Sequence, residues 1–148
     1  MATRSIIAKL DDKGVQAIYC HNDGYLSNNG KILDQHYQNE EKVDELLAQG
    51  DVSIINENIG VKLDFNDFKS FHANKQCRFY NRDRGENRAK AEVLKDENEL
   101  LEFAFETCDA DLVYMYAYNA WYVYDNSDKI GNSRYDFMEL EAALYVSN

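Results

Sequence analysis

Apolar and polar residues alternate in two neighbouring stretches near the start of the chain, at 4–10 and 15–21. Strict alternation is typical of a half-buried strand. The residues between the two stretches are Asp11-Asp12-Lys13-Gly14, and the glycine can supply the positive φ that a tight turn requires. The pattern therefore predicts a β-hairpin in which 4–10 pairs with 15–21.

A second hairpin is predicted near the end of the chain, where residues 112–118 alternate most clearly. One face of this strand would carry Leu112, Tyr114, Tyr116 and Tyr118. Asn119-Ala120 supplies the turn, and residues 121–124 pair back. Residues 77–80 predict a strand and 61–65 a weak strand, 51–55 form a short apolar segment, and 56–74 as a whole fits no single element.

Apolar residues at helical spacing predict helices at roughly 30–37, 40–49 and 97–107, and from near Tyr135 to the end. Three of these helices begin beside capping side chains: Ser27-Asn28-Asn29, Asn39, and Asp96 with Glu99 at capping-box spacing. Gly50 suits the end of the second helix. Two hairpins mixed with helices predict an α+β domain, an antiparallel sheet built from the two hairpins with three to four helices packed on it.

Composition agrees with one domain over residues 1–148, since 45% of the residues are hydrophobic. Cys20, Cys77 and Cys108 are odd in number, widely spaced and free of any CxxC motif, which is typical of a reducing compartment. No apolar run approaches the length needed to span a bilayer, and the N-terminus lacks the apolar core of a signal peptide. We therefore expect a cytoplasmic protein that does not bind membranes.

The net charge of −11 is unevenly distributed. Residues 75–95 contain seven Lys and Arg against three acids, whereas residues 96–148 contain two against twelve. Such an acidic segment repels nucleic acid and attracts basic surfaces, including those of proteins that themselves bind nucleic acid. The alternative is an acidic surface that serves solubility alone.

Residues 19–25, Tyr-Cys-His-Asn-Asp-Gly-Tyr, place a thiol, an imidazole and a carboxylate where a strand gives way to a helix. Cys20 and His21 are adjacent, so on a strand they point to opposite faces and cannot form a nucleophile–base pair. A catalytic Cys20 would require His36 or His72, and the sequence favours a buried structural cysteine. His21 beside Asp23 suits a general base, but the sequence favours a loop-capping role.

No metal or cofactor is predicted, because the three histidines are far apart and no cofactor motif is present. A ligand site is a separate alternative. Arg82 and Arg84 flank a carboxylate in Arg82-Asp83-Arg84-Gly85-Glu86, and two arginines can grip a phosphate in bidentate fashion. If this turn folds back onto residues 21–23, a nucleotide- or phosphate-binding site, or a hydrolase site, would comprise His21, Asp23, Arg82, Arg84 and Glu86. Alternatively the arginines pair with Asp23, Glu86 or the acidic end of the chain.

The second hairpin carries a tyrosine ladder, with Tyr114, Tyr116 and Tyr118 on its first strand and Tyr122 and Tyr124 on its second. This ladder also has two interpretations. It is either cross-strand stabilisation within the sheet or, if exposed, a protein interface. Stacking of single-stranded nucleic acid would need basic neighbours, and the neighbours are acids. The interface would comprise Asp109, Asp111, Tyr114, Tyr116, Tyr118, Tyr122, Tyr124, Asp125, Asp128, Asp136, Glu139 and Glu141.

Several segments, taken together, resemble a family of small uncharacterised proteins of bacteriophages and prophages. They are 5–8, Tyr19-Cys20-His21-Asn22-Asp23-Gly24-Tyr25, 30–33, 36–37, 42–43, 46–47, 50–53 and Arg82-Asp83-Arg84-Gly85-Glu86. The resemblance covers most of the chain and is strongest in its first 55 residues, although the family usually has Trp at the position of Asn22. It implies a phage origin and no particular reaction; small acidic phage proteins are often inhibitors of host enzymes or defence systems.

The sequence therefore predicts a phage-encoded accessory protein, more suited to binding than to catalysis. It would bind and inhibit or modulate a host protein with a basic or nucleic-acid-binding surface, in the bacterial cytoplasm, through its acidic and tyrosine-rich end. The alternative is the small-ligand site described above.

Overall fold

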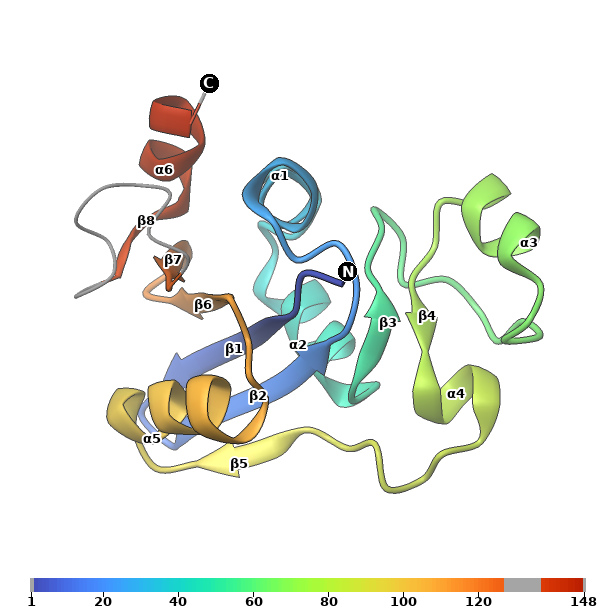
Figure 1. Cartoon of the computed structure of the whole chain (residues 1–148), viewed down its shortest axis with the longest axis horizontal. Helices are drawn as coiled ribbons and strands as arrows, with labels where there is room; N and C mark the ends of the chain where they lie inside the picture. Colours follow the sequence, from blue (N-terminus) through green and yellow to red (C-terminus); the bar gives the residue numbers. More distant parts are fainter. Residues whose placement is uncertain (1, 127–136, 148) are drawn as a thin grey trace.

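The first predicted hairpin is confirmed and lies in the middle of the sheet. β1 (Ser5–Asp11) and β2 (Gly14–Cys20) pair antiparallel, with Ile7 opposite Ile18, and Gly14 closes the turn at a φ of 120°. The computed structural model describes residues 2–126 and 137–147 (Figure 1). The second hairpin, β6 (Leu112–Ala117) with β7 (Ala120–Asp125), is also confirmed.

The eight strands of the described residues form one mixed sheet, so the expected α+β class is correct and the expected purely antiparallel sheet is wrong. β6 lies parallel to β1. β3 (Val52–Ile54) lies parallel to β2, and in this pairing Cys20 of β2 lies opposite Val52 of β3. Parallel neighbours require a crossover, and between β2 and β3 two helices provide it.

The remaining strands are short and pair antiparallel with their neighbours. β4 (Arg78–Phe79) pairs with β3, and β8 (Met138–Glu139) pairs with β7. β5 (Glu92–Leu94) pairs with the first half of β2. It lies along the same edge of β2 as β3, which pairs with the other end of that strand. The order is β4-β3-β2-β1-β6-β7-β8.

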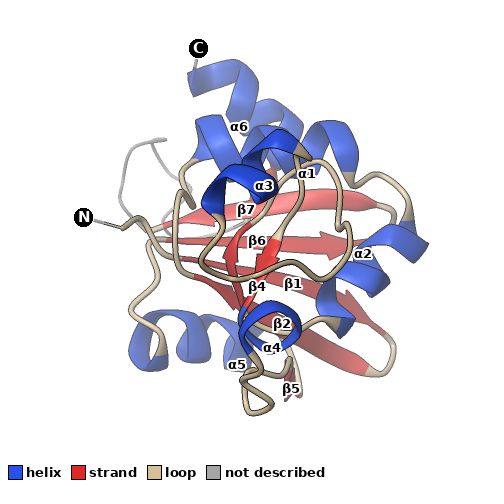
Figure 2. Ribbon diagram, turned by 90° about the vertical axis from the view of Figure 1, so that its right-hand side faces the viewer, coloured by secondary structure: helices blue, strands red, loops and turns tan. Residues whose placement is uncertain are grey.

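Helices cover both faces of the sheet (Figure 2). α1 (Lys31–His36), α2 (Glu40–Ala48) and α6 (Leu140–Ser147) pack on one face, against Ile7, Ile18 and Val123. The other face packs against α5 (Glu97–Glu102) and the π-helical turn that continues it, η2 (Phe103–Thr107), through Leu100 and Ala104. The six α-helices of the described residues exceed the three to four expected.

Covering both faces buries the tyrosines of β6. Alternation along β6 is as predicted, but all six of its residues are buried: Leu112, Val113, Tyr114, Met115, Tyr116 and Ala117. Tyr114 and Tyr116 pack beneath α1, α2 and α6, and Tyr114 donates a hydrogen bond to the Gly24 carbonyl at 2.6 Å. The stabilising interpretation is therefore the correct one for these two residues.

The predicted helix starts have different outcomes. Asn39 caps α2 by accepting from the Glu41 N–H at 2.7 Å, and Asp96 caps α5 by accepting from the Glu99 N–H at 3.0 Å. The cap predicted at Ser27-Asn28-Asn29 is wrong, because Gly30 precedes α1 and a π-helical turn, η1 (Leu26–Gly30), lies before it.

Two other boundaries differ from expectation. The last helix begins at Leu140 and not near Tyr135, because Met138–Glu139 pairs with β7 as β8; Tyr135 lies outside the described residues. No strand forms at 61–65, where backbone groups bond to side chains such as that of Gln76. An unpredicted helix, α3 (Phe68–Ala73), follows and begins at the capping residue Asp67.

Within the described part of the chain, every helix is too short or too polar to reach across a bilayer.

Candidate functional site

The loop after β2 is held to the neighbouring strand β3. The His21 N–H donates to the Val52 carbonyl at 3.0 Å, and Asn22 Nδ2 donates to the carbonyl and the hydroxyl of Ser53 at 3.2 and 3.1 Å. His21 Nδ1 lies 2.7 Å from the Tyr19 hydroxyl. Asp23 is exposed at a φ of 57°. His21 thus bonds to a phenol and not to the Asp23 carboxylate.

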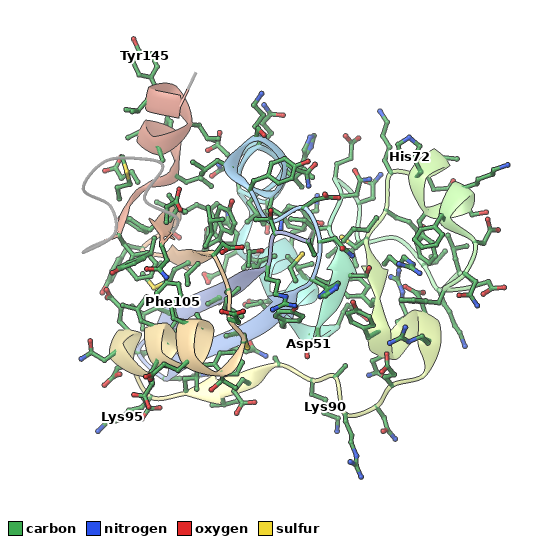
Figure 3. All side chains as sticks on the ribbon, in the orientation of Figure 1. Asp51, His72, Lys90, Lys95, Phe105 and Tyr145 are labelled. Atoms are coloured by element: carbon green, nitrogen blue, oxygen red, sulfur yellow. The ribbon has the colours of Figure 1, made fainter. Side chains whose placement is uncertain are left out.

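Cys20 has the environment of a structural cysteine. It is completely buried; its Sγ donates to the Asn22 carbonyl at 3.4 Å and lies 3.3 Å from Asn29 Nδ2. Burial raises the pKa of the Cys20 thiol to about 12. No hydrogen bond in the described residues joins Cys20 to His36, which lies 3.6 Å from the Glu57 carboxylate, or to His72 on α3 (Figure 3).

Thiol labelling tests this arrangement. Burial raises the pKa of the half-buried Cys108 from 9.0 to about 11, so below pH 9 its thiolate fraction is about 100-fold smaller than that of an ordinary cysteine. In the native protein we expect slow labelling of one thiol per chain, faster as pH approaches 11 and abolished in Cys108→Ser. Cys20 and Cys77 should react only on unfolding; rapid native labelling of Cys20 at pH 7 would contradict its structural role.

The second polar segment forms a helix, α4 (Tyr80–Arg84), that carries a buried ion pair. Asp83 accepts from Arg82 Nε at 3.0 Å and from the backbone N–H groups of Phe79 and Leu63 at 2.8 and 3.0 Å. Arg82 also donates to the carbonyls of Ile59 and Cys77 at 2.9 and 3.0 Å. The guanidinium of Arg82 is therefore directed into the fold.

The two halves of the predicted ligand site are not bonded to each other. Across residues 2–126 and 137–147, no hydrogen bond or ion pair links His21 or Asp23 to Arg82, Arg84 or Glu86. Arg84 instead pairs with Glu86 at 2.6 Å, one of the partners expected in the alternative, whereas Arg82 pairs with Asp83, which was not among them.

A stack of arginine and aromatic side chains lies beside α4 and was not predicted from the sequence. The guanidinium of Arg78 lies 3.5 Å from the ring centroid of Phe65 and 3.9 Å from that of Phe68. Arg78 is buried, which lowers its pKa, and it donates to the Phe65 carbonyl and to Ser53 Oγ at 2.7 and 3.0 Å. The stack fastens the loop before α3 to β4. No local sequence signal singles out Arg78.

An open surface hollow of about 420 Å³, called the cavity below, lies beside the second half of β2, on the face that α5 covers. Its walls are Tyr19, Asp51, Arg88, Lys90, Glu92, Phe103, Thr107 and Cys108. Burial raises the pKa values of Tyr19, Asp51 and Cys108, with a smaller contribution from the Glu92 carboxylate at the latter two. Perturbed groups gathered in one cavity are typical of functional sites.

At the opposite end of the sheet, three adjoining hollows of about 430, 730 and 200 Å³ lie between the β1–β2 turn, the start of α2 and the β6–β7 turn. We call them together the acidic groove. The carboxylates that line it are Asp11, Asp12, Glu40, Glu41 and Asp44. The sequence placed these acids on a turn and a helix but gave no sign that they share one surface.

The expected partner surface is divided by the fold. Tyr118 is 83% exposed at the β6–β7 turn, whereas Tyr122 and Tyr124 are half-buried on β7 and Tyr124 packs against Phe105. Asp125 is buried. The exposed acids of the expected set are Asp109, Asp111, Glu139 and Glu141, and Asp128 and Asp136 lie outside the described residues.

Among the described residues, no group of three or more His, Cys, Asp and Glu side chains is arranged to hold a metal ion. No protein-family model, curated protein or solved structure matches the chain.

Proposed function

We propose that the protein binds a basic segment of another protein in the acidic groove, and that it acts without catalysing a reaction. The resemblance to phage proteins supports a host protein as the partner, met in the bacterial cytoplasm and inhibited or modulated on binding. An acidic interface was expected from the sequence at the C-terminal acids and the tyrosine ladder. The interface is acidic here too, but it lies at the groove.

The observation that carries the proposal is the charge of the groove. Five carboxylates line it against Lys9 and Lys13. Lys9 is internally neutralised, because its Nζ lies 2.7 Å from Asp44 and 3.3 Å from Glu40. Burial alone lowers the pKa of Lys9, but these two carboxylates outweigh it and raise the pKa, so Lys9 stays protonated. Asp12 and Glu41 have no side-chain partner in the described residues and remain available to a basic ligand.

Two exposed apolar side chains stand at the walls of the groove. Tyr118 is 83% exposed and Val93 is 79% exposed. Aromatic and apolar anchors supply much of the affinity of protein interfaces, while charges around them set specificity and association rate. The groove combines both features on one surface.

The test is a charge reversal in the groove. D12K/E41K is expected to weaken binding of the captured partner by about tenfold or more, ~1.4 kcal/mol, because two unpaired carboxylates become cations. The partner is first isolated from bacterial lysate on the tagged protein, and the Kd is then measured with purified components at two salt concentrations.

The matched control is E139K/E141K, which makes the same change in net charge at the C-terminal end. It should leave the Kd within about twofold, since neither residue lines the groove and exposed charges outside the contact are screened at physiological salt. Equal losses in the two variants would show that net charge alone governs binding and would overturn the groove as the site.

A further inference from the structure

The cavity beside Tyr19 and Asp51 is built from four separate segments of the chain. β2 supplies Tyr19, the residue before β3 is Asp51, and η2 with the residue after it supplies Phe103, Thr107 and Cys108. The linker between α4 and β5 supplies Arg88 and Lys90. Figure 3 labels Asp51 and, on the linker below it, Lys90.

The walls are fixed to one another. The Asp51 N–H donates to the Ala89 carbonyl at 3.0 Å, which holds the linker against β3, and Asp51 Oδ1 accepts from the Tyr19 N–H at 2.9 Å. On the far side η2 is a π-helical turn, and Asp109 just beyond it has a φ of 54°. Irregular helical turns and unusual backbone angles of this kind concentrate at functional sites.

The polar groups of the cavity have unused bonding capacity. In the part of the chain that the structure describes, Asp51 Oδ2 has no hydrogen-bond partner, and Arg88 and Lys90 form neither an ion pair nor a side-chain hydrogen bond. Two exposed cations, Arg88 and Lys90, thus line the cavity together with the exposed carboxylate of Glu92, and Asp51 contributes a free carboxylate oxygen. The rings of Tyr19 and Phe103 line the space with them.

We propose that this cavity binds a nucleoside monophosphate, with the phosphate at Arg88 and Lys90 and the base against the rings of Tyr19 and Phe103, where an amino group of the base donates to Asp51. A phosphate matches paired cations, and aromatic rings stack on the π-face of any base. A carboxylate accepts hydrogen bonds from exocyclic amino groups, as it does from cytosine N4. The volume lies within the range of small-molecule sites.

The test uses the full-length protein and isothermal titration with AMP, GMP, CMP, UMP and inorganic phosphate. We expect saturable binding of AMP, GMP and CMP, weaker binding of UMP, which has no exocyclic amino group, and the weakest binding of phosphate. R88Q/K90Q should weaken all five by about tenfold or more, since each loses its charge-assisted contacts. The matched control K69Q/K95Q removes two exposed lysines outside the cavity and should leave all five affinities unchanged.

Asp51→Asn tests the base contact separately. The amide oxygen can still accept from the Tyr19 N–H, so the fold is retained, while an NH2 group, which donates, replaces the second carboxylate oxygen. Affinity for AMP, GMP and CMP should fall by about tenfold and affinity for phosphate should not change. No saturable nucleotide binding, or equal binding by the parent protein and R88Q/K90Q, would overturn the proposal. The cavity and the acidic groove share no residue, so either can fail alone.

Discussion

Replacing Asp83 by alanine is expected to lower the free energy of unfolding by about 3–5 kcal/mol, because it removes one partner of a buried ion pair. The Asp83 side chain is fully buried and accepts hydrogen bonds from Arg82 and from the backbone of Leu63 and Phe79. The substitution leaves a buried guanidinium without its carboxylate and two N–H groups without acceptors. Urea denaturation followed by the fluorescence of Trp121, the single tryptophan, measures the loss.

Glu86→Ala is the matched control within the same segment. Glu86 pairs with Arg84 at 2.6 Å, but both side chains are about half exposed, so the expected loss is below about 1 kcal/mol. A loss in Asp83→Ala as small as that in Glu86→Ala would contradict the structural role assigned to this ion pair.

The local elements of the fold follow from short-range signals. The two hairpins, the cap at Asn39 and the cap at Asp96 depend on residues within a few positions of one another, and all are confirmed. Each is favoured by its own side chains before any tertiary contact forms.

The neighbours of each strand could not be predicted in this way. Alternation along β6 shows that Tyr114 and Val113 face opposite ways, but not that helices cover both faces. That covering depends on β6 pairing parallel with β1, more than a hundred residues earlier in the chain. The burial of Asp83 could not be predicted for the same reason, since the segment of Leu63, whose N–H donates to Asp83, has no clear strand or helix pattern.

The functional surfaces depend on this long-range assembly even more. The acidic groove requires the β1–β2 and β6–β7 turns to meet at one end of the sheet, and the parallel pairing of β1 with β6 brings them together. The cavity requires the linker that contains Ala89 to lie against Asp51, which no pattern near either residue indicates. Sequence alone therefore identified charges and rings but not the surfaces they form.

The contact between this linker and β3 depends on Gly50, and Gly50→Ala is expected to lower the free energy of unfolding by about 3–5 kcal/mol. Gly50 has a φ of 82°, and a Cβ placed on it would lie 2.0 Å from the Ala89 carbonyl oxygen. The alanine therefore adds a backbone clash to the cost of a left-handed conformation. The melting temperature should fall by about 10 °C.

Gly85→Ala separates the cost of the left-handed conformation from the cost of the clash, because Gly85 has a φ of 78° and a Cβ there would meet nothing within 4 Å. Its expected loss is only the conformational part, about 1–2 kcal/mol. The difference between the variants measures how tightly the linker is held. If it is held as described, the Asp51 amide, which donates to Ala89, should also exchange its hydrogen faster in Gly50→Ala than in Gly85→Ala. Equal losses and equal exchange rates would show that the linker moves freely, and the cavity would then lack the fixed wall on which nucleotide binding depends.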